Sequence, residues 1–407
     1  MPNRPIQIAL SIVAAVAASF SVANSQDRFP ATHSPVESPP VFRVQEVVAA
    51  EIIQGPDYHL DIDVPVRQNL YLYKIHTPYG DIQALGSNML EQRLREMHAI
   101  ENACKLVRDP QLVKGIVETF RQTPQGARVV LTDPGGTIMR APKGFRRMAS
   151  NLLNPQNARA GGEDRRRFAV SIGCDPETTN PVLIPLLDNL AVRKSIGKNG
   201  SNLGMNVVLP GLGLLSVTKD FDNELITQSP SEINSGIEKE LQAMGVWEPV
   251  ARQFCRERSY TTMQRMIFMG HLRTLKDVQN FQYLVYRATT AYDESEGLGM
   301  IRELRLIRRL HEQHGVISID LQGLPVVMLR DSSVVIVNAS DYIFDSQDMR
   351  DAMASFRRTR PNDPAIFITA GKVSEDAKVM LANFDVQVVE SGNTTMVERI
   401  ATQTPRR

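Results

Sequence analysis

The last part of the chain alternates between the two-residue apolar repeat of a strand and the longer repeat of a helix, and this alternation constrains the fold most. The predicted strands are Val316–Asp320, Val326–Leu329, Val334–Val337, Ala365–Thr369 and Val386–Val389, and the predicted helices are Ser346–Arg358 and Ser374–Phe384. Two strands joined through a helix usually pair in parallel. Residues 316–392 therefore predict a small α/β module with some parallel pairing.

The middle of the chain keeps the helical repeat. Apolar residues recur every three or four positions in four segments, which are Ser231–Met244, Val250–Arg258, Thr261–Thr274 and Gly297–His314. An apolar, Gly-containing insertion at Val207–Leu215 precedes them. Residues 168–315 are therefore expected to form a helical region.

A small antiparallel sheet followed by a helix is predicted nearer the N-terminus. Alternating and β-branched residues occupy Asp57–Val64 and Leu70–Thr77, and Pro78–Gly80 signals a tight turn before the chain returns. Ser87 can then cap a helix whose apolar residues keep helical spacing. Residues 46–120 thus predict an N-terminal sheet-plus-helix unit, which gives the whole chain an α+β class.

Three stretches carry short motifs that point to a family. They read LYLYKIHTPYGDIQALGSNMLEQRLREMHAIE (residues 70–101), VLTDPGGTIMRAPKGFRRM (residues 130–148) and GCDPETTNP (residues 173–181). Together they resemble a family of uncharacterised exported bacterial proteins that share a TPYG hairpin, a TDPxGT segment and a DPxTxNP turn. The resemblance covers most of the chain. It implies export and this order of units, and it assigns no activity and no catalytic residue.

The N-terminus has the pattern of a cleavable secretory signal peptide. Arg4 is positive, Ile6–Phe20 is mostly apolar, and Ala23–Ser25 offers small residues for cleavage before Gln26. The apolar core of about 15 residues is shorter than the roughly 20 that a stable membrane span needs. We therefore expect residues 1–25 to be removed, and the mature chain to be periplasmic or extracellular without a transmembrane span.

The bulk composition limits the partners and the redox chemistry. The chain has 46 Lys and Arg residues against 45 Asp and Glu residues, a balance that argues against dedicated nucleic-acid binding. Cys104, Cys174 and Cys255 are too few for a disulfide scaffold, and Cys104 and Cys255 lie in helix-like stretches where burial is favoured over pairing. Residues 26–45 predict a Pro-rich linker and residues 393–407 a flexible tail.

Positive charge is concentrated in residues 121–167, which we interpret as a basic connector containing Gly and Pro. Its arginines either neutralise acidic parts of the same chain or dock on an anionic envelope surface or a partner protein. The candidate binding residues for docking are Arg140, Lys143, Arg146, Arg147, Arg165, Arg166 and Arg167.

Two clusters of metal-ligand side chains lie within single segments. The first consists of His59, Asp61 and Asp63, which would share one face of a strand and suit a divalent metal. The same alternation is also typical of a solvated strand face. The second consists of Asp341, Asp345 and Asp348, which could bind magnesium after a strand or favour the start of the next helix.

Two further motifs have ordinary structural explanations. His311 and His314 share one side of a helix end, where basic residues compensate the helix dipole and Gly315 stops the helix. Thr369–Lys372 lies where an α/β sheet can hold an anion, but it lacks a glycine pattern.

The sequence contains no nucleophile elbow, phosphate loop or dinucleotide-binding glycine motif. It therefore favours a binding or structural role in the bacterial cell envelope, and no cofactor is predicted. A metal-dependent periplasmic hydrolase is the alternative.

Overall fold

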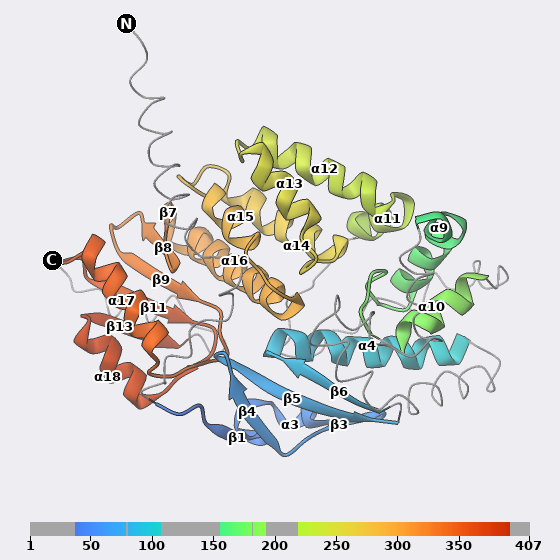
Figure 1. Cartoon of the computed structure of the whole chain (residues 1–407), viewed down its shortest axis with the longest axis horizontal. Coiled ribbons are helices and arrows are strands. Elements are labelled where there is room, and N and C mark those ends of the chain that lie inside the picture. The colour runs from blue at the N-terminus through green and yellow to red at the C-terminus, as the bar shows by residue number, and fades with distance from the viewer. Residues whose placement is uncertain (1–36, 79, 107–154, 181, 193–218, 391–407) are drawn as a thin grey trace, which may run out of the picture.

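The computed structural model describes residues 37–390, except for residue 79, residues 107–154, residue 181 and residues 193–218. These residues combine an antiparallel N-terminal sheet, a helical middle and a mixed C-terminal sheet (Figure 1). The predicted α+β class is confirmed. The predicted signal peptide at residues 1–25 and the predicted tail at residues 393–407 lie outside the described residues.

The N-terminal sheet is antiparallel throughout and is organised around one long strand. Its strands are β1 (Val41–Arg43), β2 (Gln54–Gly55), β3 (Tyr58–Leu60), β4 (Asp63–Arg67), β5 (Leu70–Thr77) and β6 (Gly80–Leu85). Strand β5 pairs with β3, β4 and β6, and alternate side chains of β5 such as Tyr73 and Ile75 are buried. Strand β1 pairs with β4, although it falls inside the predicted linker at residues 26–45, so that the linker range was too long.

The predicted hairpin is present between β5 and β6. Thr77 lies opposite Gly80 in the ladder, and the Thr77 hydroxyl donates a hydrogen bond to the Gly80 carbonyl oxygen over 2.7 Å. Gly80 has φ of 128°, a conformation that residues with a Cβ rarely adopt.

Replacing Gly80 by valine is expected to lower the free energy of unfolding by about 1 kcal/mol or more, because a β-branched residue is strained at this φ. Urea unfolding measures the change. The matched control is Gly236→Ala in the interior of a helix, where an added Cβ meets no atom within 4 Å and should be neutral or stabilising. An unchanged midpoint for Gly80→Val would contradict the turn assignment.

Helices form the middle of the chain, and most of them were predicted. They are α4 (Ser87–Leu106), α9 (Pro155–Ser171), α10 (Leu183–Val192), α11 (Lys219–Thr227), α12 (Pro230–Ala243), α13 (Glu248–Arg256), α14 (Thr262–Leu272), α15 (Gln282–Ala288) and α16 (Glu294–His314). Side-chain caps fix several starts, since Ser229, Thr261 and Asp293 accept hydrogen bonds from the first turns of α12, α14 and α16.

Helix α9 corrects the predicted connector. It begins at Pro155, so the last part of residues 121–167 is helical. The physical reason is its apolar end, because Phe168, Ala169 and Val170 are buried and tie the helix to the core. Helices α10, α11 and α15 lie in the region that was expected to be helical, but no individual segment was predicted for them.

The C-terminal module confirms the predicted mixture of parallel and antiparallel pairing. Its sheet contains β7 (Val316–Gln322), β8 (Leu324–Leu329), β9 (Val334–Asn338), β11 (Ala365–Thr369) and β13 (Val386–Glu390). The spatial order is β13-β11-β9-β8-β7, in which β9, β11 and β13 are parallel and the other pairings are antiparallel. A short parallel pair, β10 (Tyr342–Ile343) and β12 (Lys372–Val373), lies beside it.

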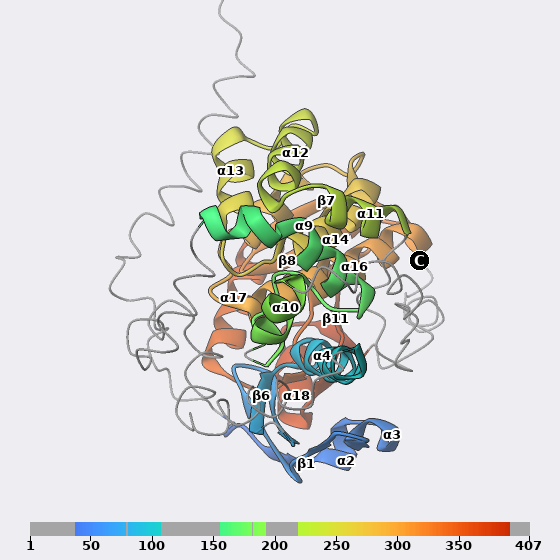
Figure 2. The same ribbon diagram turned by 90° about the vertical axis from the view of Figure 1, so that its right-hand side faces the viewer.

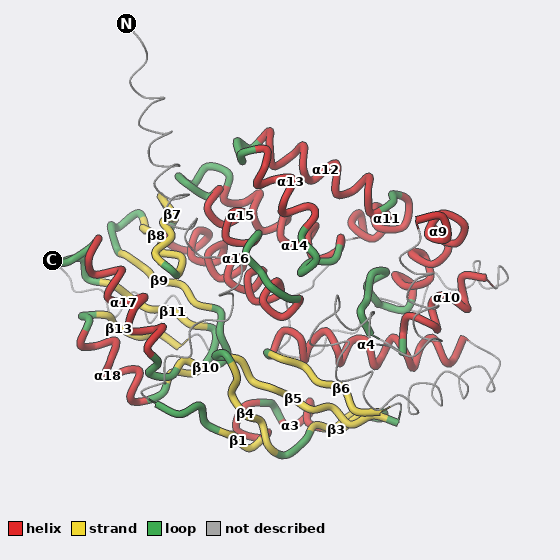
Figure 3. Tube along the Cα trace, viewed as in Figure 1, coloured by secondary structure: helices red, strands yellow, loops and turns green. Residues whose placement is uncertain are grey.

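Helices cover both faces of this sheet. On one face, α17 (Gln347–Thr359) and α18 (Glu375–Asn383) pack on inward side chains such as Ile336 and Phe367. On the other face, Val337 and Ile368 belong to the main core together with side chains of α16. Figure 3 shows α16 on the side of this sheet that faces away from α17 and α18. A sheet covered on both faces needs strands that are apolar at every position, and β9 and β11 are buried throughout.

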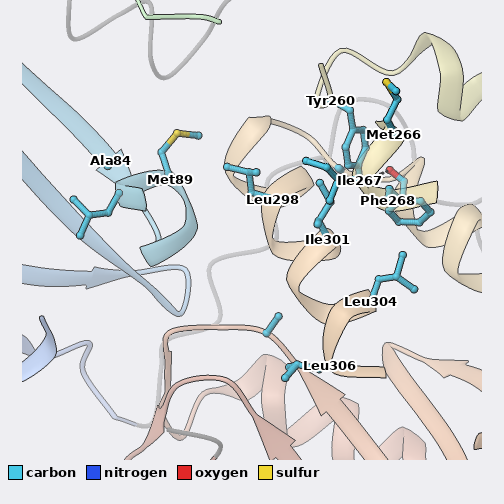
Figure 4. Close-up of a cluster of buried hydrophobic side chains, with 14 of the residues drawn as sticks. Ala84, Met89, Tyr260, Met266, Ile267, Phe268, Leu298, Ile301, Leu304 and Leu306 are labelled. Atoms are coloured by element: carbon cyan, nitrogen blue, oxygen red, sulfur yellow. Dashed lines mark hydrogen bonds between the residues drawn. The ribbon is translucent and has the colours of Figure 1, made fainter. Parts of the chain in front are cut away.

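Helix α4 lies between the N-terminal sheet and the helical middle in both perpendicular views (Figures 1 and 2). Figure 4 shows Met89 of α4, Phe268 of α14 and Leu298 of α16 among the buried apolar side chains that join these units. Among the described residues, no helix is both long enough and apolar enough to cross a membrane.

Candidate functional site

Charged and polar side chains from distant parts of the chain meet in the interior, where α4, residues 175–180 and the starts of α14 and α16 come together. We call this group the buried polar junction. Its central guanidinium is Arg93 of α4, whose side chain is 2% exposed. Arg93 Nη1 donates to Glu96 Oε2 over 2.7 Å, and Arg93 Nη2 donates to Thr179 Oγ1 over 2.9 Å and lies 3.5 Å from Glu294 Oε2.

Glu96 is surrounded by hydrogen-bond donors. The Thr178 hydroxyl donates to Glu96 Oε1 over 2.6 Å, and the Asn180 side-chain amide donates to Glu96 Oε2 over 3.0 Å. Asn180 Oδ1 in turn accepts from the Val182 amide over 3.0 Å, which fixes the turn before α10. The Thr-Thr-Asn turn therefore supplies the donors that a buried carboxylate requires.

Glu294, at the start of α16, is held from three sides. Gln92 Nε2 donates to Glu294 Oε1 over 2.6 Å, Gln264 Nε2 donates to the same oxygen over 3.2 Å, and Thr179 Oγ1 donates to Glu294 Oε2 over 2.9 Å. These bonds link α4, α14 and α16 to one another. The junction is thus a closed network rather than an open set of reactive groups.

Asp175 lies at the edge of the junction, and its carboxyl group has a raised pKa. Its carboxylate accepts from the Thr261 hydroxyl over 2.5 Å and from the Glu177 amide over 2.8 Å. Burial, reinforced by the negative charge of Glu177, raises the pKa of Asp175 from 3.8 to about 7. Burial also raises the pKa of the neighbouring Cys174 thiol well above its usual value, so this thiol is a poor nucleophile.

The raised pKa of Asp175 predicts a pH-dependent stability. The folded chain binds this proton more tightly than the unfolded chain, so the stabilisation is present below about pH 4 and is lost as the pH rises to about 7. Urea unfolding at about pH 5 and about pH 8 should show a loss of about 2 kcal/mol or more in the wild type. The Asp175→Asn variant should lose clearly less. Asp188→Asn is the control, because Asp188 lies at a partly exposed ion pair with Arg165 and should leave the wild-type slope unchanged.

The buried polar junction has the features of a structural network and not those of a catalytic site. Its carboxylates are engaged by protein donors, and none of the side chains described in it is a histidine. In the described part of the chain, no group of three or more His, Cys, Asp or Glu side chains is arranged so that it could hold a metal ion. The hydrogen bonds of the junction connect four segments, which are α4, residues 175–180, α14 and α16.

A second buried centre surrounds Asp341, which is 1% exposed. Asp341 Oδ2 accepts from the Tyr71 amide over 3.2 Å and from the Ser87 amide over 2.8 Å. Asp341 Oδ1 accepts from Arg302 Nη1 over 2.8 Å, and Arg302 also donates to the Ala339 and Ala370 carbonyls. Both oxygens of this predicted magnesium ligand are thus used to join the N-terminal sheet, α16 and the C-terminal module.

The other two acids of that predicted cluster have separate partners. Asp345 accepts two hydrogen bonds from Arg350, over 2.7 and 2.6 Å. Asp348 lies in the first turn of α17, which Ser346 caps. This arrangement agrees with the interpretation that negative charge favours the helix start.

The first predicted metal cluster is divided by a break in the strand. Strand β3 ends at Leu60 and β4 begins at Asp63, so the predicted single strand over Asp57–Val64 was wrong. The Asp61 amide still donates to the Lys74 carbonyl over 2.8 Å, but the next backbone bond, from the Val44 amide to the Ile62 carbonyl over 2.8 Å, is made with a different segment. Ile62 is 58% exposed, not buried as the alternation would require.

The three side chains of that cluster also have individual neighbours. Asp63 forms an exposed ion pair with Arg43 over 2.7 Å, Asp61 lies 3.6 Å from His76, and the His59 ring stacks on the His76 ring with centroids 4.8 Å apart. His76 itself also contacts Asp81 over 2.8 Å. Metal binding by His59, Asp61 and Asp63 stays a prediction.

The remaining motifs have structural roles. His311 Nδ1 lies 3.2 Å from the Val316 carbonyl, and Gly315 ends α16 with φ of 71°. Gly371 approaches the backbone of Asp341 so closely that an added Cβ would lie 1.9 Å from its carbonyl oxygen. Lys372 Nζ donates to the Glu46 carbonyl over 2.6 Å.

The predicted anion-binding arginines fall into two groups. Arg140, Lys143, Arg146 and Arg147 lie outside the described residues, so their role stays a prediction. The other three lie on α9 and have partners inside the protein. Arg165 Nε donates to Asp188 over 2.9 Å, Arg166 donates to the Ile226 carbonyl over 3.2 and 3.1 Å, and Arg167 pairs with Glu163.

Cys174 and Cys255 are free and buried, as expected for Cys255. Sequence reasoning missed a different basic group, formed by Arg305, Arg308 and Arg309 on α16 and His271 on α14. The Arg308 guanidinium contacts the His271 ring, with 3.0 Å between Nη1 and Nδ1. The repeat of arginines three and four residues apart was the available signal.

No protein-family model matches the chain. The comparisons with curated proteins and with solved structures gave no significant match either. The functional interpretation therefore rests on the geometry of the chain itself.

Proposed function

We propose that the protein is an exported binding protein of the bacterial cell envelope, with a ligand or partner surface that is anionic. Export is supported by the apolar N-terminal pattern and the small residues at Ala23–Ser25. The binding role is supported by one contrast, between buried carboxylates that have partners and arginines of α16 that have none among the described residues. The buried carboxylates of the junction are paired with protein donors, whereas Arg305 and Arg309 make no hydrogen bond or ion pair with a described residue.

This contrast favours binding over catalysis. A general acid or base needs a carboxylate or imidazole that can reach a substrate, and Glu96 and Asp341 are enclosed by donors of the protein. Cations that solvent can reach, such as the exposed Arg309 and the half-buried Arg305, attract anionic surfaces at long range in a salt-dependent way.

The experiment is fractionation of cells that express the full chain in its native host, followed by intact-mass measurement. The expected result is a species beginning near Gln26 in the periplasmic or extracellular fraction, with an envelope-bound part that salt releases. A cytoplasmic species that retains Met1 would contradict export. A divalent-metal-dependent hydrolysis that is lost in His59→Ala or Asp63→Asn would contradict the binding role.

A further inference from the structure

Three arginines of α16 gather beside one histidine of α14. Arg305, Arg308 and Arg309 are spaced by three and four residues, so their guanidiniums lie on neighbouring parts of one helix face. His271, at the end of α14, contacts Arg308 over 3.0 Å. We call Arg305, Arg308, Arg309 and His271 the cationic cluster.

Little negative charge compensates this cluster. Glu312 lies 2.9 Å from Arg308 Nε, while Arg305 and Arg309 have no hydrogen bond or ion pair with any residue that the structure describes. Arg305 is half-buried, and Arg309 is exposed. Burial lowers the pKa of Arg305, as do the charges of Arg309 and Arg308, although Glu91 acts in the opposite direction. The guanidiniums therefore repel one another, and a bound anion would remove that cost.

His271 is neutral and carries its ring proton on Nε2. Burial and the three guanidiniums lower its pKa to about 4. A guanidinium can only donate, so His271 Nδ1 must accept the bond from Arg308, and Nε2 must carry the ring proton. His271 Nε2 is buried and has no hydrogen-bond partner among the described residues. A buried N–H without an acceptor is costly and calls for one.

The three guanidiniums of the cluster can only donate hydrogen bonds, and the neutral His271 adds no negative charge to them. Guanidinium forks match the oxygens of phosphate in geometry as well as in charge, and Arg dominates phosphate recognition for that reason. We propose that the cationic cluster binds a phosphate group, carried either by an anionic lipid headgroup or by a free phosphate compound. This inference rests on the proposed function and names the chemistry of its ligand.

The test compares the full mature chain with a double variant, Arg305→Gln with Arg309→Gln. Neither arginine has a described partner, so the double variant should fold with an unchanged or higher thermal midpoint. Arg358→Gln is the matched control, because Arg358 is also an exposed helical arginine without a described hydrogen bond or ion pair, and it lies on α17.

Two probes distinguish the sources of phosphate. Calorimetric titration with inorganic pyrophosphate tests a free compound, and co-sedimentation with phosphatidylglycerol–phosphatidylcholine vesicles tests a headgroup, with phosphatidylcholine vesicles as the blank. The wild type should bind at least one probe, and the double variant should bind it at least about tenfold more weakly. Arg358→Gln should bind like the wild type.

The pKa of His271 is a second measurement, and it should not change on addition of the probe if the arginines are purely structural. In imidazole NMR spectra, with the His271 signal assigned by its loss in His271→Gln, the bound anion should raise the pKa of His271 from about 4. The inference is overturned if the wild type binds neither probe, or if Arg358→Gln loses as much affinity as the double variant. If the protein reaches the envelope and the double variant still binds there with wild-type affinity, only this inference fails, and the proposed function stands.

Discussion

Replacing Glu96 by alanine is expected to lower the free energy of unfolding by about 3–5 kcal/mol. The substitution removes the main charge partner of Arg93, whose side chain is 2% exposed, and it also removes the acceptor of Thr178 and Asn180. An uncompensated guanidinium and two buried donors without an acceptor each carry a desolvation penalty. Urea unfolding at neutral pH measures the sum.

The control for this prediction is Glu248→Ala, which removes an exposed ion pair with Arg252 on α13. That change should cost less than about 1 kcal/mol, because water replaces the lost partner. A second variant, Arg93→Met with Glu96→Leu, removes both charges and should recover part of the loss. Equal costs for Glu96→Ala and Glu248→Ala would show that the junction is not a stabilising network.

Asp341→Asn is expected to lower the free energy of unfolding by about 2–4 kcal/mol. Arg302 loses the negative charge of its partner. The side-chain NH2 group of the asparagine is a hydrogen-bond donor, and it would face either Arg302 or the Tyr71 and Ser87 amides, which are donors too. Because these contacts join the N-terminal sheet to the C-terminal module, hydrogen exchange at the Tyr71 and Ser87 amides should also accelerate.

The matched control is Asp63→Asn, since Asp63 forms an exposed ion pair with Arg43 in the same sheet. It should change the stability by less than about 1 kcal/mol. If exchange at Tyr71 and Ser87 were unaffected by Asp341→Asn, the Asp341 carboxylate would not be the acceptor that holds these amides.

Local patterns predicted most of the elements. The hairpin was predicted from Pro78 and Gly80, because a tight turn with positive φ depends on the residues of the turn itself. The strands of the C-terminal module were predicted from their apolar runs. The short pair β10 and β12 was not, since two residues carry too little periodicity to be recognised.

The buried polar junction could not be predicted for a different reason. On α4, the spacing of Leu90, Leu94 and Met97 indicates one buried apolar face, and it gives no information about the polar Arg93 and Glu96. Arg93 and Glu96 are buried because residues 178–180 and Glu294 of α16 contact them, and a periodic pattern in one helix does not indicate a second partner of that helix. Similarly, the alternation at His59, Asp61 and Asp63 does not show that β3 ends at Leu60 and that a separate strand begins at Asp63.

The bond between Asp341 and the Tyr71 amide spans 270 positions of the sequence, and that between Ser374 and Glu37 spans 337. At synthesis rates of roughly 5–20 residues per second, about 15–50 s pass between the synthesis of the N-terminal sheet and that of Asp341. During this interval the Tyr71 and Ser87 amides have no carboxylate to bind. The N-terminal sheet and the C-terminal module can therefore dock only late in folding. This docking closes a loop that contains most of the chain, and the loss of conformational entropy on closure precedes the gain from the native contacts.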